Sequence, residues 1–174
     1  MVRPHLDDIP ELALPDGVEV RPARPDHFRA IWEAHAEAFA GSWGEADPGE
    51  EEWQEFLDDP TNDPALWRVA WCGDQVVGQV RSFINHQENS EIGRLRGYTE
   101  QIATHPDWRG RGIASALLAL SLAAVRDRGM TEAALGVDTE NPANALAIYQ
   151  RLGFRLDAFE ATYDKPVGQA LRSG

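Results

Sequence analysis

The spacing of apolar and polar residues in the first part of the chain predicts one strand and two helices. Val18 to Arg21 alternates apolar and polar residues, as a half-buried strand does. Apolar residues at intervals of three and four between Pro25 and Phe39 predict a helix. The stretch from Trp53 to Leu57 predicts a second, shorter helix, which Asp59-Pro60 ends.

A hairpin follows in the pattern, and two segments lack regular periodicity. β-rich runs from Leu66 to Cys72 and from Gln75 to Ile84 flank Gly73-Asp74, which predicts a two-residue hairpin turn. Asn85 to Gly97 is polar and contains glycines, so we expect a loop there, of the kind that can line a site. Arg3 to Asp16 is rich in proline and aspartate and is expected to wrap the surface.

The second half alternates strands and helices. Tyr98 to Thr104 predicts a strand, which His105-Pro106 ends. A long helix follows from about Ile113, and the basic residues before Gly129 mark its end. Beyond it the pattern predicts, in order, a strand, a capped helix and two further strands: Ala133 to Val137, Asn141 to Leu152, Phe154 to Phe159 and Tyr163 to Val167. A mixed α/β fold is therefore expected.

Length and composition fit one domain. The chain has 174 residues, and no repeat or low-complexity tract divides it. We assign residues 1–17 to an N-terminal extension and residues 18–174 to a single domain. No apolar run approaches the roughly 20 residues of a membrane helix, and the first residues lack the apolar core of a secretory signal. Cys72 is the only cysteine, so we expect a cytoplasmic protein.

Charge narrows the choice of partners. The formal net charge of −13 disfavours nucleic acid and anionic membranes, whose binding needs lysine and arginine. Acidic residues are dense between Glu45 and Asp59, and they can be read in two ways. They are either a solvated helical face or a surface that attracts a cationic small molecule.

A glycine-rich segment lies between the predicted strand and the long helix. Its sequence, residues 109–114, is Arg109-Gly110-Arg111-Gly112-Ile113-Ala114. The backbone N–H groups at a helix start have no helical partner, so this turn can hold an anion, with two arginines beside a diphosphate. The other interpretation is a tight helix start packed on a strand. A dinucleotide fingerprint has different spacing, and a phosphate-binding P-loop is excluded because the only lysine is Lys165.

From Ile102 to Phe154 the sequence resembles the GNAT acetyltransferases. Their acetyl-CoA signature is Gln or Arg, two residues, Gly, one residue, then Gly or Ala, and the segment above matches it at Arg109, Gly112 and Ala114. The stretch from Asn141 to Phe154 resembles their second motif, an Asn-led helix with a tyrosine near its end and Gly-Phe after it. The resemblance implies the GNAT fold: a single mixed, largely antiparallel sheet with splayed fourth and fifth strands and about four flanking helices.

The region before these motifs resembles the family more loosely. The segments from Trp43-Gly44 through Trp53 to Leu66-Trp67 are similar to the halves of tandem GNAT proteins related to mycothiol synthase. Aminoglycoside-modifying relatives are equally compatible with the acidic composition. The acceptor therefore stays open among polyamines, aminoglycosides, amino acids and protein N-termini, and the acidic residues favour a small cationic molecule.

The resemblance implies an N-acetyltransferase that moves the acetyl group of acetyl-CoA directly to a primary amine in a ternary complex. The pyrophosphate is expected on the N–H groups of Arg111 to Ala114, with Asn144 near the pantetheine or phosphate arm. The pantetheine is expected along Ile102, Ala103 and Thr104. The N–H of Ile102 is expected near the thioester carbonyl, where it would stabilise the oxyanion.

Two residues are candidates for proton transfer. Glu100 is the candidate base. The two-residue period of a strand would place its side chain on the same face as that of Ile102. Alternatively, Glu100 is only a polar surface residue of the strand. Tyr98 and His86 are weaker candidates. Tyr149 is the candidate acid for the thiolate, because a phenol, with a pKa of about 10, carries a proton at neutral pH that it can donate. Its other interpretation is a core aromatic residue.

Metal and covalent chemistry have no support in the spacing of residues. The five histidines are scattered and Cys72 stands alone, so no zinc site is predicted. Ser115, Ser121 and Cys72 lack a neighbouring base, which favours direct transfer. The alternatives are a non-catalytic acyl-CoA-binding module of the same fold, a protein N-terminal acetyltransferase and a transferase of longer acyl groups. Either a monomer or a homodimer is compatible with the sequence.

Overall fold

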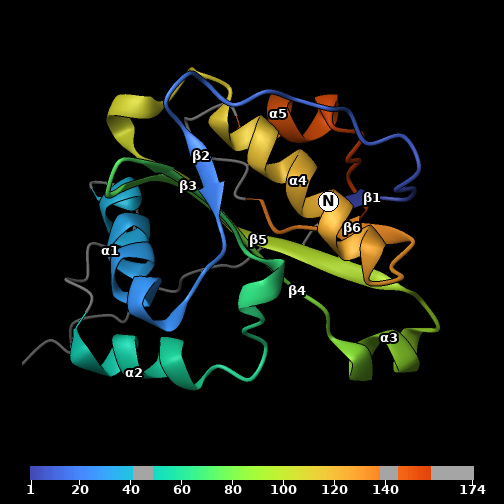
Figure 1. Cartoon of the computed structure of the whole chain (residues 1–174). Helices are drawn as coiled ribbons and strands as arrows, with labels where there is room; N and C mark the ends of the chain where they lie inside the picture. Colours follow the sequence, from blue (N-terminus) through green and yellow to red (C-terminus); the bar gives the residue numbers. More distant parts are fainter. Residues whose placement is uncertain (41–48, 138–144, 158–174) are drawn as a thin grey trace, which may run out of the picture.

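A single six-stranded sheet forms the centre of the molecule (Figure 1). The computed structural model describes residues 1–40, 49–137 and 145–157. The strands follow the spatial order β1-β6-β5-β4-β3-β2, and only β5 and β6 pair in parallel. The mixed α/β fold with a largely antiparallel sheet is confirmed. The strands are β1 Val2–Arg3, β2 Glu19–Arg21, β3 Arg68–Cys72, β4 Gln75–Phe83, β5 Arg96–Thr104 and β6 Glu132–Ala134.

Five α-helices lie among the described residues. They are α1 Phe28–Phe39, α2 Glu50–Asp58, α3 His86–Ile92, α4 Ile113–Asp127 and α5 Ala145–Arg151. Three short 3-10 turns precede α1, β3 and α4: η1 Pro25–His27, η2 Pro64–Leu66 and η3 Pro106–Trp108. The predicted helices at α1, α2 and α4 and the hairpin of β3 and β4 are confirmed. None of the described helices is long and apolar enough to cross a membrane.

The two faces of the sheet are covered by different helices. Adjacent residues of a strand point to opposite faces, and β4 shows this directly. A Cβ on Gly78 would lie 2.7 Å from Ile113 Cγ2 of α4, whereas Gln79 donates from Nε2 to the carbonyl of Ile31 in α1 at 3.0 Å. The main core lies between the sheet and α4, and a smaller cluster lies under α1.

Close contact between β5 and α4 gives a stability prediction. A Cβ on Gly97 would lie 2.8 Å from Val125 Cβ, so Gly97→Ala forces the helix outward. We expect a loss of about 1–3 kcal/mol in unfolding free energy, measured by urea denaturation. Gly136→Ala is the control, because its Cβ would meet nothing nearer than the Glu100 carboxylate oxygens at 3.7 Å. Equal losses in the two variants would contradict the prediction.

Strands β5 and β6 separate along their length. They pair only from Arg96 to Tyr98 on β5, and β5 continues to Thr104 beyond the end of β6. This is the splay that the family resemblance implied. A bulge lies just past the separation: β5 has one more residue than β4 between the pairs Gln79–Ala103 and Arg81–Glu100.

The segment from Asn85 to Gly97, predicted to be a loop, contains a helix, so that prediction is wrong. Helix α3 begins after Asn85, whose side chain accepts from Glu88 N at 3.0 Å, and it ends at Gly93 in the left-handed region, with φ 65°. The segment is too polar to show apolar periodicity. Its two caps hold the helix instead.

The N-terminal segment was expected to wrap the surface, and for its first residues this is wrong. Val2 and Arg3 form β1, which pairs with β6 at the edge of the sheet. The Arg3 side chain is buried; it donates to the carbonyl of Leu152 and pairs with Asp8 at 2.6 Å. Leu6 is only 2% exposed and belongs to the main core. A two-residue strand is too short for any periodicity to reveal it.

The structure describes only part of the C-terminal segment for which a helix and two strands were predicted. Arg155 forms an isolated bridge with Val2 where a strand from Phe154 to Phe159 was predicted. The strand expected at Tyr163 to Val167 lies outside the described residues. So do Asn141 and Asn144, and the helix predicted from Asn141 is described only as α5.

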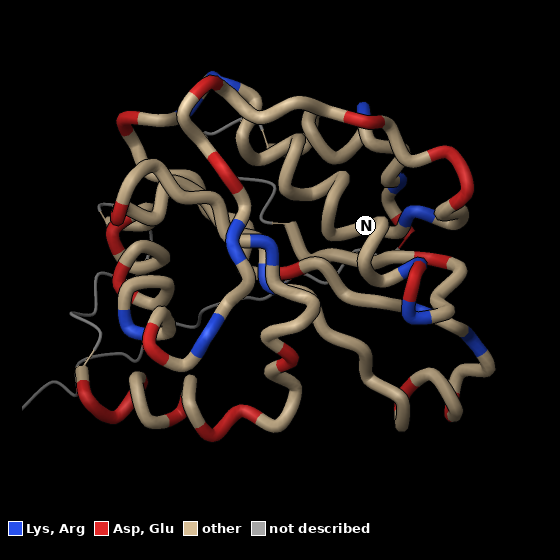
Figure 2. The backbone as a smooth tube through the Cα atoms, in the orientation of Figure 1, with Lys and Arg blue, Asp and Glu red and all other residues tan. Residues whose placement is uncertain are grey.

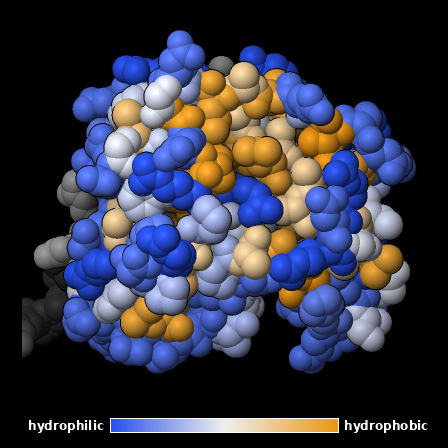
Figure 3. Space-filling view, viewed as in Figure 1, coloured by the Kyte–Doolittle hydropathy of each residue, from blue (hydrophilic) through white to orange (hydrophobic). Residues whose placement is uncertain are grey.

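Acidic residues are spread over the whole backbone, with a run along α2 (Figure 2). Glu50, Glu51 and Glu52 occupy the first turn of α2, where negative charge favours a helix. This helix packs on α1 through aromatic pairs, with 5.4 Å between the ring centroids of Trp53 and Trp32. Hydrophobic residues gather over α4 on the face shown in Figure 3. Leu120 of this helix is one of the exposed large apolar residues.

Candidate functional site

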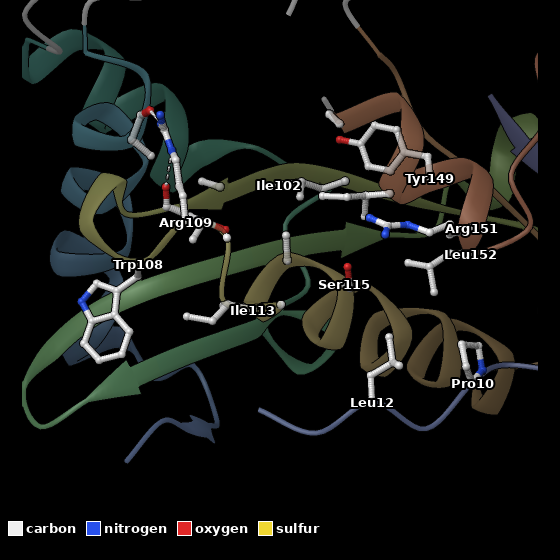
Figure 4. A pocket seen from close by; sticks show the side chains of 18 of the residues that line it. Pro10, Leu12, Ile102, Trp108, Arg109, Ile113, Ser115, Tyr149, Arg151 and Leu152 are labelled. Atoms are coloured by element: carbon white, nitrogen blue, oxygen red, sulfur yellow. Dashed lines mark hydrogen bonds between the residues drawn. The ribbon is translucent and has the colours of Figure 1, made fainter. Parts of the chain in front are cut away.

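One large cavity lies where the end of β5, the start of α4 and helix α5 meet (Figure 4). We call it the first cavity; its volume is about 840 Å³. Most of the residues predicted from the glycine-rich motif and the preceding strand line it: Ile102, Ala103, Thr104, Arg109, Gly110, Gly112, Ile113 and Ala114. Tyr149 lines it from the α5 side. Asn144 lies outside the described residues.

The start of α4 offers backbone donors to this cavity. Gly112 caps the helix with φ 82°, and the first helical hydrogen bond runs from Ala116 N to Gly112 O at 3.0 Å. The N–H groups before Ala116 therefore have no partner in the helix. Gly110 also has a positive φ, 74°, and a Cβ on either glycine would point into open space. The two glycines thus leave room for a bulky anion at the helix start.

The two arginines of the motif hold the shape of its loop. Arg109 donates from Nη2 to the carbonyl of Ala38 at 2.6 Å, which ties the loop to the end of α1. Arg111 is not among the residues lining the first cavity. Its guanidinium lies 4.6 Å from the ring centroid of Trp108, a residue that does line the cavity. The expected contact of both arginines with a diphosphate stays a prediction.

Tyr149 is a buried residue with its hydroxyl at the cavity. Its side chain is 7% exposed, and its ring packs edge-to-face on Phe154 with centroids 6.2 Å apart. In Figure 4 the hydroxyl points away from α5 toward the side where Ile102 lies. Burial, with a smaller contribution from the charge of Glu100, raises the pKa of Tyr149 above its usual value. The phenol therefore keeps its proton at neutral pH.

Glu100 lies at the point where β5 leaves β6. Its Oε1 accepts from Gly136 N at 3.0 Å, in the gap just past the end of β6. Burial raises the pKa of Glu100 above its ordinary value, and the hydrogen bond from Gly136 opposes part of that rise. A carboxyl group in this state is a better proton acceptor than an exposed glutamate.

The expected shared face of Glu100 and Ile102 is wrong, because the bulge interrupts the alternation of β5. Gln101 has φ 50°, a value that non-glycine residues rarely adopt. Glu100 is opposite Arg81 and lines a second cavity, whereas Ile102 packs against the main core and lines the first. Neighbouring residues of the bulge therefore line different cavities, Glu100 and Gln101 the second and Ile102 the first.

The second cavity has a volume of about 590 Å³ and lies between α1, α2 and the sheet. Four carboxylates line it, Glu52, Glu55, Asp59 and Glu100, beside several aromatic rings. The acidic stretch noticed in the sequence thus contributes directly to a cavity. Tyr98 and His86, the weaker base candidates, line neither of the two cavities described here. Tyr98 instead donates to Glu88 at 2.5 Å.

Sequence reasoning missed two residues of the second cavity, His35 and Arg81. Burial, together with the nearby charge of Arg81, lowers the pKa of His35 to about 4, so this imidazole is neutral at neutral pH. Arg81 interrupts a run of small and apolar residues on β4, and that was the one available signal. Among the described residues, no group of three or more His, Cys, Asp or Glu side chains is arranged to hold a metal ion.

The raised pKa of Glu100 gives a pH-dependent stability prediction. The folded protein holds the Glu100 proton more tightly than the unfolded chain does. The free energy of unfolding therefore falls as the pH rises from below 4.5, the ordinary pKa of a glutamate, through the higher pKa that Glu100 has in the folded protein. Glutamine cannot ionise and can still accept from Gly136. We therefore expect the Tm of Glu100→Gln to rise relative to wild type between acidic and neutral pH. A trend of equal size in Glu91→Gln, an exposed residue of α3, would contradict it.

The fold and the first cavity define a family, and comparisons with known proteins agree. The model of the Acetyltransferase (GNAT) family matches residues 28–154. The chain belongs to this family. A mycothiol acetyltransferase from Geodermatophilus obscurus is 32% identical over 164 residues, which cover 91% of this chain and 51% of the relative. The chain spans about half the length of the curated relatives it matches.

Solved structures share the fold. A GCN5-related N-acetyltransferase from Sphaerobacter thermophilus has a TM-score of 0.70 at 29% identity, covering 87% of this chain and 46% of that one. The structure of AAC(6')-Iy with the bisubstrate analogue CoA-S-monomethyl-acetylneamine has a TM-score of 0.62 at 19% identity, covering 85% of this chain and 97% of that one. At that identity the second similarity concerns the fold alone.

Proposed function

We propose that this chain transfers the acetyl group of acetyl-CoA directly to the primary amine of a small cationic molecule, in a ternary complex. The observation that carries the proposal is that neighbouring residues of the β5 bulge line two different cavities. The first cavity joins a glycine-rich helix start to Tyr149, and the second is lined by carboxylates. An acyl donor and an amine bound in the two cavities would meet beside Glu100.

The first cavity suits the donor. Its pyrophosphate would be held by the free N–H groups of Ile113 and Ala114, where the open space beside Gly110 and Gly112 accommodates it. The pantetheine would lie along Ile102 to Thr104, a part of β5 that has no pairing with β6. Membership of the Acetyltransferase (GNAT) family, whose model matches residues 28–154, supports an acetyl donor in this cavity.

The reaction needs one oxyanion donor and two proton transfers. The amine attacks the thioester carbonyl, and the N–H of Ile102 at the bulge would stabilise the oxyanion. Glu100 would accept the proton from the amine, directly or through water. As the carbon–sulfur bond breaks, Tyr149, whose raised pKa keeps its phenol protonated at neutral pH, would give its proton to the thiolate and then recover a proton from solvent.

Calorimetry and thiol release test the proposal. Acetyl-CoA is titrated into the protein, and release of free thiol is then followed with putrescine, an aminoglycoside, lysine and a peptide with a free N-terminus. Binding together with amine-dependent thiol release supports acetyl transfer. Binding without release from any amine would leave a non-catalytic acyl-CoA-binding module. Folded protein that does not bind acetyl-CoA would overturn the proposal.

A further inference from the structure

Arg81 is the one arginine among the residues that line the second cavity, beside four carboxylates. It lies on β4 and lines the second cavity, and its Nε is buried without a hydrogen-bond partner among the described residues. Its guanidinium carbon lies 4.9 Å from the ring centroid of Phe56 and 5.7 Å from that of Trp67. These rings hold the planar group in place but accept no hydrogen bond from its edge. A half-buried guanidinium whose buried Nε has no partner suits a planar anion.

The nearest carboxylates do not serve as that anion. Glu100 is directly opposite Arg81 in the sheet, yet its Oε1 accepts from Gly136 N. Asp59 accepts at Oδ1 from both the backbone N and the hydroxyl of Thr61, at 2.8 and 2.7 Å. No ion pair of Arg81 occurs within the described part of the chain. Its charge is therefore available to a ligand.

The register brings a cation and a carboxylate to the same cavity. Arg81 of β4 pairs with Glu100 of β5, and both residues line the second cavity, although no ion pair joins them in the described part of the chain. A ligand that satisfies both carries an anion and an ammonium a few bonds apart. A doubly charged phosphate is disfavoured by the four carboxylates around the cavity, whereas a carboxylate bears a single charge and matches the guanidinium fork.

We infer that the second cavity takes an acceptor with a carboxylate beside its amine, specifically an amino acid with a second ammonium group. Arg81 binds the carboxylate, Glu100 faces the amine that is acetylated, and Glu52, Glu55 and Asp59 favour the extra positive charge. The identity of this acceptor rests on the proposed acetyl transfer. His35, which also lines the cavity, adds no charge at neutral pH.

Two pairs of probes that differ only by a carboxylate test the inference. Lysine and cadaverine, and ornithine and putrescine, are titrated by calorimetry into protein saturated with CoA. We expect the amino acids to bind about 10- to 100-fold more tightly than the diamines, the range for hydrogen bonds to a charged group. In Arg81→Met this preference falls to about one, because the long apolar side chain keeps the packing and loses the charge.

The matched control is Arg21→Met, which removes another arginine stacked on a tryptophan, with 5.5 Å to the Trp71 ring, outside both cavities. It is expected to keep the preference of the wild type. Thermal unfolding checks each variant, and Arg81→Gln, with a polar head, replaces Arg81→Met if that variant does not fold. Equal binding of diamines and amino acids to wild type, or a preference that survives the loss of Arg81, would overturn the inference.

Thiol release with the same probes separates this inference from the proposed function. Preferential binding of lysine or ornithine with release of thiol supports both. A binding preference without thiol release from any probe would overturn acetyl transfer and leave the carboxylate site at Arg81 in place. Thiol release from diamines and amino acids at equal efficiency would support acetyl transfer and overturn the carboxylate site.

Discussion

Tyr149→Phe is expected to lower kcat by about 100- to 1,000-fold with little change in the affinity for acetyl-CoA. The substitution removes only the hydroxyl, so the buried ring keeps its edge-to-face contact with Phe154. General acid catalysis contributes about this factor when the acid is well placed, and the departing thiolate would then have to take its proton from water. Steady-state thiol release gives kcat, and calorimetry gives the Kd for acetyl-CoA.

Tyr98→Phe is the matched control. Tyr98 is half-buried, donates a hydrogen bond to Glu88, and stacks on Phe83 with ring centroids 5.0 Å apart. It lines neither cavity, so its loss is expected to leave kcat within about threefold of wild type. A kcat of Tyr149→Phe equal to that of the wild type would contradict the role of Tyr149 as the acid. A large loss in Tyr98→Phe would move that role, or the role of the base, to Tyr98.

Gly112→Asp is expected to weaken acetyl-CoA binding by at least about 100-fold. Gly112 precedes α4 at the start of the cavity, and a side chain there would extend into open space that the pyrophosphate is proposed to fill. A carboxylate at this point repels the pyrophosphate and takes the free N–H groups for itself. Calorimetric titration with acetyl-CoA measures the effect.

Gly112→Asn separates charge from backbone strain. Gly112 has φ 82°, and asparagine and aspartate both tolerate this left-handed region better than other residues, so the two variants share shape and strain. We expect the asparagine variant to lose less than about tenfold in affinity, since a neutral amide repels no phosphate. Equal losses in the two variants would show that the side chain acts through bulk and that no anion is bound at this helix start.

The parts of the site that could be predicted from sequence are those built from neighbouring residues. Arg109 to Ala114 form one turn, whose glycines and place before a helix mark it as an anion site. Tyr149 belongs to a helix whose motif extends to Gly153-Phe154. In the same way Gly73-Asp74 predicted the hairpin of β3 and β4. In each case the physical cause, a positive φ, a helix start or a two-residue turn, acts over a few residues.

The parts that could not be predicted depend on distant segments. The alternation of side chains along a strand predicted that Glu100 and Ile102 share one face. In the structure β5 has one extra residue in its pairing with β4, and this bulge turns the two side chains to different cavities. Helix α3 was missed because its caps, not its apolar spacing, define it. Strand β1 exists only because β6 offers it a partner.

By itself the sequence determined a mixed α/β fold of the acetyltransferase family, its glycine-rich helix start and the tyrosine that lines the same cavity, because short-range backbone chemistry specifies these features. Only the tertiary structure decided which charged residues share a cavity. In the sequence Arg81 is one more polar residue of a strand, and only the packing of α1 and α2 places it, half-buried, in a cavity with Glu100. The cost of burying charge depends on what surrounds it, and these surroundings come from segments far apart in the chain.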